Sequence, residues 1–120
     1  GDGPEAYSLR ITGEGNGWSA ATTKNGADVN KNVLSALFSA TSETLIDLSY
    51  FNETANEDVV MAIGATRAAQ PIFGSNRLSE GGFLVPVGAD RNLWLEFKAP
   101  IKDTIGVNQS IGVTINAEAQ

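Results

Sequence analysis

Residues 7–12 read Tyr-Ser-Leu-Arg-Ile-Thr, with an apolar side chain at every second position. Successive side chains of a β-strand point to opposite faces, so this alternation is typical of a strand with one buried face. The same period of two recurs in residues 46–50, 59–63, 93–97 and 111–115. The sequence therefore predicts an all-β protein.

Turn-forming residues separate these alternating runs. Glycine and asparagine are concentrated in residues 13–17, 25–26, 52–58, 81–82, 88–90 and 106–108. Short strands at this spacing are typical of a β-sandwich or jelly roll. We expect strands near 6–12, 17–23, 33–39, 44–51, 58–65, 82–87, 92–98 and 109–118. Residues 33–40 also fit one face of a short helix, and residues 65–69 fit a helical turn.

Length and charge restrict the possible partners. The 120 residues are enough for one domain, and 8 basic against 14 acidic residues give a net charge of −6. A nucleic-acid binder needs a basic surface, and so does a protein that docks on an anionic membrane. We therefore expect neither partner. The chain also contains no apolar run of the length that spans a membrane as a helix.

The chain contains no cysteine and no histidine. This excludes disulfides, Cys/His zinc sites and Ser-His-Asp or Cys-His catalysis. Carboxylates are the remaining acid–base candidates, and their spacing does not indicate the paired carboxyls of a glycosidase. We expect a protein that is not an enzyme, and we assign no catalytic residues.

Two loops carry oxygen ligands of the kind that calcium prefers. Glu53, Glu57 and Asp58 lie in one loop, and Asp90 and Asn92 lie in another. No Asp-x-Asp-x-Asp-Gly loop is present, so a solvated acidic surface is the favoured interpretation. We expect no cofactor and no metal site, and keep calcium as the alternative.

Gly13, Gly15 and Gly17 alternate with Glu14 and Asn16 directly after the first predicted strand. The third glycine of a dinucleotide-binding loop falls at Trp18, and the Gly-Lys-Ser/Thr ending of a P-loop is missing. We therefore interpret residues 13–17 as a hinge or wide turn.

Two further patterns indicate surface roles. Trp18 and Trp94 are candidates for stacking on sugar rings, although a sandwich edge or a second covering layer explains them equally well. Asn52-Glu53-Thr54 and Asn108-Gln109-Ser110 match the acceptor pattern for N-glycosylation and fall in predicted turns.

The N-terminal strand has two possible positions. It is the first strand of its own domain if it folds back. If it swings out on the hinge, it completes the sheet of a neighbouring molecule, and Tyr7, Leu9 and Ile11 fill pockets there. Head-to-tail repetition of that contact produces a filament. The residues alone leave both positions open.

The order of features in the rest of the chain resembles a known family. A strand runs into an asparagine-containing turn over 45–54, and an apolar strand follows over 58–63. A Pro/Gly turn in 83–88 precedes 92–97, and the chain closes on 109–119 with an Ala-Glu-Ala ending. Over residues 40–120 this order is similar to the TasA/camelysin-type biofilm fibre proteins and the archaeal bundling-pilus subunits.

The resemblance implies a jelly-roll-like β-sandwich of residues 18–120, preceded by a donor strand and hinge in residues 1–17. It implies a secreted subunit whose signal peptide has been removed. Such subunits form an extracellular homopolymer, head to tail, that mediates cell–cell adhesion or biofilm formation, with lateral bundling as a further contact. The alternative interpretation of the sequence is a monomeric carbohydrate-binding or adhesin-like module.

Overall fold

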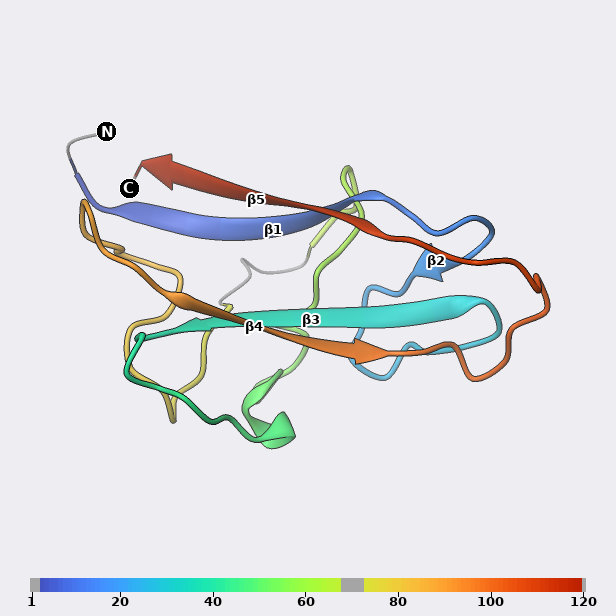
Figure 1. The fold of residues 1–120 in the computed structure, drawn as a ribbon, viewed down its shortest axis with the longest axis horizontal. Helices are drawn as coiled ribbons and strands as arrows, with labels where there is room; N and C mark the ends of the chain where they lie inside the picture. The colour runs from blue at the N-terminus through green and yellow to red at the C-terminus, as the bar shows by residue number, and fades with distance from the viewer. Residues whose placement is uncertain (1–2, 68–72, 120) are drawn as a thin grey trace.

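The computed structural model describes residues 3–67 and 73–119, and its strands form two sheets (Figure 1). In the first sheet, β1 (Glu5–Gly13) pairs antiparallel with β5 (Gly112–Ala119). The second sheet contains β2 (Ser19–Ala20), β3 (Lys31–Ser39) and β4 (Asn92–Lys98) in that order. β3 is parallel to β2 and antiparallel to β4. The described residues contain no α-helix, so the prediction of an all-β fold is confirmed.

The main core lies between β1 and β3. It contains Leu9 and Ile11 of β1, Leu34, Ala36 and Phe38 of β3, and Val60 and Phe73 from the connecting segments. Tyr7 joins it at one end, where its ring meets that of Phe38 edge-on with the centroids 5.2 Å apart. Each large side chain buried in this way stabilises the fold by about 1.5–3 kcal/mol.

β3 is the middle layer of the molecule and is buried from Asn32 to Ser39. One face packs toward β1, and on the other face Val33 belongs to a second cluster with Ala21, Val59 and Met61. A strand covered on both faces has no polar side, which removes the period-two signal. This is why the sequence also allowed a helix over residues 33–40, an alternative that is wrong.

The strand expected over residues 44–51 is not formed. A 3-10 helix, η1 (Leu48–Tyr50), follows a loop, and the side chain of Asp47 accepts a hydrogen bond of 2.8 Å from the backbone N–H of Ser49. Of the alternating residues Ile46, Leu48 and Tyr50, Leu48 is 70% exposed and the other two are half-buried, so none of them joins the core. The hydrogen bonds of the Asp47 cap and of the 3-10 turn therefore form in place of the hydrogen bonds of a β-ladder.

Three other expected strands are shorter than predicted. Residues 58–65 and 82–87 contribute only isolated bridges, at Val59, Ala62 and Val85. The strand expected over 17–23 is reduced to Ser19–Ala20. In the helical turn expected over 65–69, residues 65–67 are irregular, and residues 68 and 69 lie outside the described residues. Segments such as 59–61, buried at every position, run beside the sheets without a regular ladder.

Candidate assembly interface

β1 lies in its own domain and is hydrogen-bonded along both edges. One edge forms the ladder with β5. On the other edge the backbone N–H of Tyr7 donates to the carbonyl of Gly82 over 2.7 Å, and that of Ile11 donates to the carbonyl of Met61 over 2.9 Å. β1 is therefore an internal strand, although the segments on its second side are irregular.

The three residues predicted to act as donor side chains point into this same domain. Leu9 and Ile11 are 2% and 1% exposed, and Tyr7 is half-buried against Phe38. Among the described residues, Leu9 and Ile11 form the main core together with residues of β3, Val60 and Phe73. Removing β1 would therefore open the main core along its whole length.

The hinge predicted at Gly13, Gly15 and Gly17 begins where the β1–β5 ladder loses its register, between Ile11 and Gly13. Gly17 has a φ of +105°, which side chains rarely tolerate. The side chain of Gln109 holds the segment closed. Its Nε2 donates to the carbonyl of Asn16 over 2.6 Å, and its Oε1 accepts from the backbone N–H of Trp18 over 3.3 Å.

We expect Gln109→Ala to loosen the hinge without opening the core. The substitution removes the hydrogen bonds to Asn16 and Trp18, which corresponds to about 1–2 kcal/mol of local stability. Hydrogen exchange of the backbone amides of residues 14–18 should become faster, while exchange in β3 stays unchanged. Equal acceleration in both places would show that Gln109 supports the whole fold rather than the hinge.

An apolar strip continues the main core beyond the two central strands. We use this name for Leu93, Leu95 and Phe97 of β4 with Val113 and Ile115 of β5. Each pairs across the sheet with a core residue, since Leu93, Leu95 and Phe97 lie opposite Phe38, Ala36 and Leu34. Val113 and Ile115 lie opposite Ile11 and Leu9. Paired residues share a face of the sheet, so the strip faces the same side as the core.

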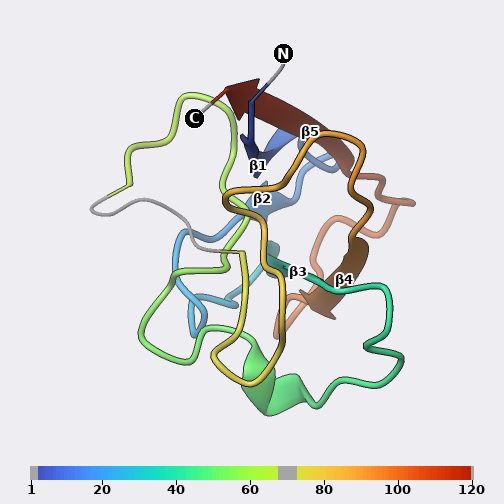
Figure 2. The same cartoon turned by 90° about the vertical axis from the view of Figure 1, so that its left-hand side faces the viewer.

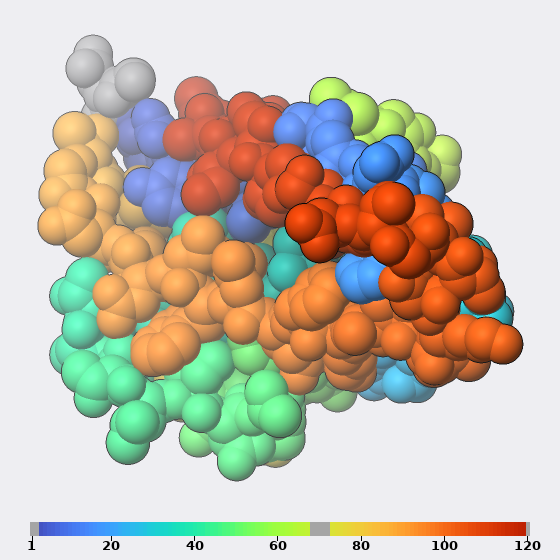
Figure 3. All heavy atoms as spheres, turned by 45° about the vertical axis from the view of Figure 1, so that its right-hand side comes forward, coloured from blue at the N-terminus to red at the C-terminus, as the bar shows by residue number. Residues whose placement is uncertain are grey.

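The residues of the apolar strip are 37–54% exposed, although Trp18 stacks on one of them, Phe97. β4 and β5 end their sheets and pair on one edge only. They lie on the same side of the molecule in the end view (Figure 2). In Figure 3 the red atoms of β5 and the orange atoms of β4 border a hollow in which atoms of β3 are visible. The sequence predicted β4 and β5 but not the exposure of their apolar faces. Alternation indicates which side chains share a face, and it contains no information on the segment that covers that face.

The two tryptophans are both engaged within the chain. The indole N–H of Trp94 donates to the hydroxyl of Ser39 over 2.9 Å, on the face of β4 opposite the apolar strip. Trp18 is stacked on Phe97 with the ring centroids 6.4 Å apart, and its indole N–H lies 3.3 Å from a carboxylate oxygen of Asp103. Both side chains are half-buried, and Trp18 has one ring face stacked on Phe97.

The two glycosylation candidates differ in exposure. Asn52 is buried, and its Nδ2 donates to the hydroxyl of Ser35 over 2.9 Å. A glycan on that nitrogen is incompatible with the packing, so Asn52 is a poor candidate for N-glycosylation in this structure. Asn108 is exposed in the loop before β5 and remains open to modification.

The residues proposed for calcium are not brought together as a ligand set. Glu53 accepts from the backbone N–H of Asn76 and pairs with Arg77 over 3.4 Å. Asp58 is fully buried, and its carboxyl oxygens accept hydrogen bonds from the backbone N–H groups of Asn52 and Gly74. Within residues 3–67 and 73–119, no group of His, Cys, Asp and Glu side chains could hold a metal ion.

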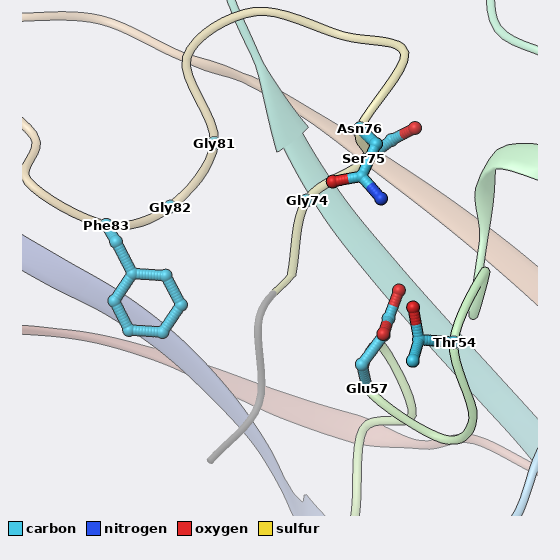
Figure 4. A pocket seen from close by; sticks show the side chains of 8 residues that line it. All are labelled: Thr54, Glu57, Gly74, Ser75, Asn76, Gly81, Gly82 and Phe83. Carbon is cyan, nitrogen blue, oxygen red and sulfur yellow. The ribbon is translucent and has the colours of Figure 1, made fainter.

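A cavity of about 270 Å³ lies beside this loop (Figure 4). Its polar lining comes from Thr54, Glu57, Ser75 and Asn76, and Phe83 forms the apolar side. Glu57 is the single ionisable group of the lining, so the cavity contains one carboxylate and no carboxylate cluster.

Comparisons with known proteins identify no relative. No family model matches the chain, and no curated protein or solved structure matches it either. In the part of the chain that the structure describes, no helix is long and apolar enough to cross a membrane.

Proposed function

We propose that this protein is the structural subunit of an extracellular filament, a pilus or a biofilm matrix fibre that mediates adhesion between cells. Identical subunits are joined head to tail by donor-strand exchange of β1, and the remaining residues form a jelly-roll-like acceptor sandwich. The observation that carries the proposal is the position of β1. It closes the core with Leu9 and Ile11, and it is followed by three glycines in residues 13–17, which we interpret as a hinge.

Exchange of β1 preserves the contacts that β1 makes. In the joined subunits the strand occupies the same position in the neighbour, so its ladder to β5 and its buried side chains are formed again. Such an exchange costs little free energy when a flexible segment lets the strand reach out. Because the donor and acceptor sites of one subunit are different surfaces, the chain of contacts stays open and extends into a filament.

We propose lateral bundling of filaments as a further contact between identical subunits, and neither catalysis nor a cofactor. We do not propose a monomeric carbohydrate-binding module, because Trp18 is stacked on Phe97 and the indole N–H of Trp94 is bound to Ser39 within the chain.

A cysteine pair across β1 and β5 tests the exchange directly. Ser8 and Asn116 are register partners, so their Cα atoms lie about 4.5–5.5 Å apart, within the range of a disulfide. The chain has no other cysteine. We expect the double variant Ser8→Cys/Asn116→Cys, oxidised as a monomer, to form no filaments under electron microscopy until it is reduced.

The same variant, oxidised after assembly, should give a ladder of covalent multiples of 12.6 kDa on a non-reducing gel. Each single-cysteine variant under the same oxidant is the control and should assemble normally. Filaments formed by the locked monomer would refute the exchange, as would oxidised filaments that dissociate into monomers on the gel.

A further inference from the structure

We infer that the apolar strip is a second contact between consecutive subunits, on which the neighbouring copy joined through the hinge packs. The inference rests on the proposed function and adds a surface to it. Strand exchange uses β1 and its surroundings, whereas the strip lies on β4 and the outer strand β5. Its occupant is a second copy of this chain.

The energetics of strand exchange require a contact of this kind. The exchanged β1 makes the same bonds in the neighbour as in its own domain, so exchange alone gives no net gain over the closed monomer. Assembly also reduces translational and rotational freedom, which opposes it. Contacts that exist only between subunits must therefore drive polymerisation. The strip is an apolar surface on paired strands that remains exposed when the contacts of β1 are formed.

The size of the strip fits a subunit contact. Five large side chains, each about half exposed, leave roughly 400 Å² of apolar surface. A specific contact buries about 800 Å² on each partner, of which somewhat more than half is apolar. The strip thus supplies most of the apolar part of one such surface. None of its residues is charged, although the chain as a whole carries a net charge of −6 that opposes association elsewhere.

The strip also adjoins the hinge. Phe97 stacks on Trp18, the first residue after the hinge, and Val113 is paired with Ile11, two residues before it. The five residues from Gly13 to Gly17 span at most about 17 Å when extended. A neighbour joined through this segment is held next to the strip, at an effective concentration far above that in solution.

Two adjacent positions of β5 provide a matched test. Ile115 lies in the strip, and Asn116 points to the opposite face, where it is also exposed. Ile115→Lys and Asn116→Lys change the net charge equally and leave the contacts of β1 in place. We expect Ile115→Lys to raise the critical concentration for filament assembly at least tenfold, whereas Asn116→Lys stays within twofold of the original chain.

Leu95→Lys on β4 is the second strip variant and should behave as Ile115→Lys does. The urea midpoint of each variant monomer reports whether the fold is intact. Equal assembly of Ile115→Lys and Asn116→Lys, with both monomers folded, would overturn the role of the strip while leaving strand exchange in place.

The sedimentation of the original chain separates failure of this inference from failure of the filament. If the chain forms no filaments but forms dimers that Ile115→Lys abolishes, the strip is a contact between copies and the filament proposal fails. If the chain stays monomeric at millimolar concentration, both fail.

Discussion

Deletion of residues 1–12 will produce a chain that forms no filaments and no longer unfolds cooperatively. The deletion removes Leu9 and Ile11 from the core and leaves β5 without its ladder partner. The two side chains alone account for about 3–6 kcal/mol of burial, against a typical domain stability of about 5–15 kcal/mol. Circular dichroism during urea titration should show a broad transition, and the exposed core should bind a hydrophobic dye.

A peptide of residues 3–13 supplied in trans should reverse this loss. If β1 can complete a second molecule, one peptide will bind each truncated chain, and the complex will unfold in a sharp urea transition. The same peptide with Leu9→Asp is the matched control and should not bind, because a carboxylate at this buried position has no partner. A truncated chain that unfolds as cooperatively as the full chain would show that β1 is dispensable, and the donor-strand proposal would then fail.

Folding stability should decrease as the pH rises from about 4 to about 7, and Asp58 is the cause. Burial raises the pKa of Asp58 to about 7, although hydrogen bonds from the backbone N–H groups of Asn52 and Gly74 oppose the shift, and the nearby charges of Glu57 and Glu53 add to it. In the unfolded chain this carboxyl ionises near 3.8. Between these values the native state binds more protons than the unfolded state, so raising the pH favours unfolding.

The decrease should amount to roughly 3 kcal/mol over this range, measured as the free energy of unfolding by urea titration at each pH. Below pH 4 the trend reverses. Hydrogen bonds from Ser49 lower the pKa of Asp47, and those from Ile105 and Trp18 lower the pKa of Asp103, so acid removes their contribution. The chain should therefore be most stable near pH 4.

Asp58→Asn is the control for this pH profile. It sets an amide N–H₂ group against one of the two backbone donors and should destabilise the fold at every pH. The slope between pH 4 and 7 should disappear in this variant. A stability that rises over that range in the original chain would instead indicate that the two backbone donors keep Asp58 ionised in the native state.

The sequence by itself determined the all-β class and the three strands in which apolar and polar side chains alternate, of which only β1 has a buried apolar face. Residues 7–12, 93–97 and 111–115 alternate because their apolar side chains point to the side of the sheet that carries the core, and the intervening side chains point to the other side. It also predicted the residues that β1 contributes to the core. Residues 46–50 alternate equally well and form no strand, because Asp47 accepts local hydrogen bonds that close a 3-10 turn and Leu48 stays exposed.

Tertiary structure alone decided which apolar faces are covered. Leu9 and Leu95 have the same pattern in the sequence, yet Leu9 is buried between two sheets and Leu95 is half exposed on β4, the edge strand of its sheet. The burial of Asp58 and the closure of the hinge by Gln109 likewise depend on segments distant in the chain. Periodicity records the direction in which a side chain points, whereas burial depends on the neighbouring layer, which only the three-dimensional packing supplies.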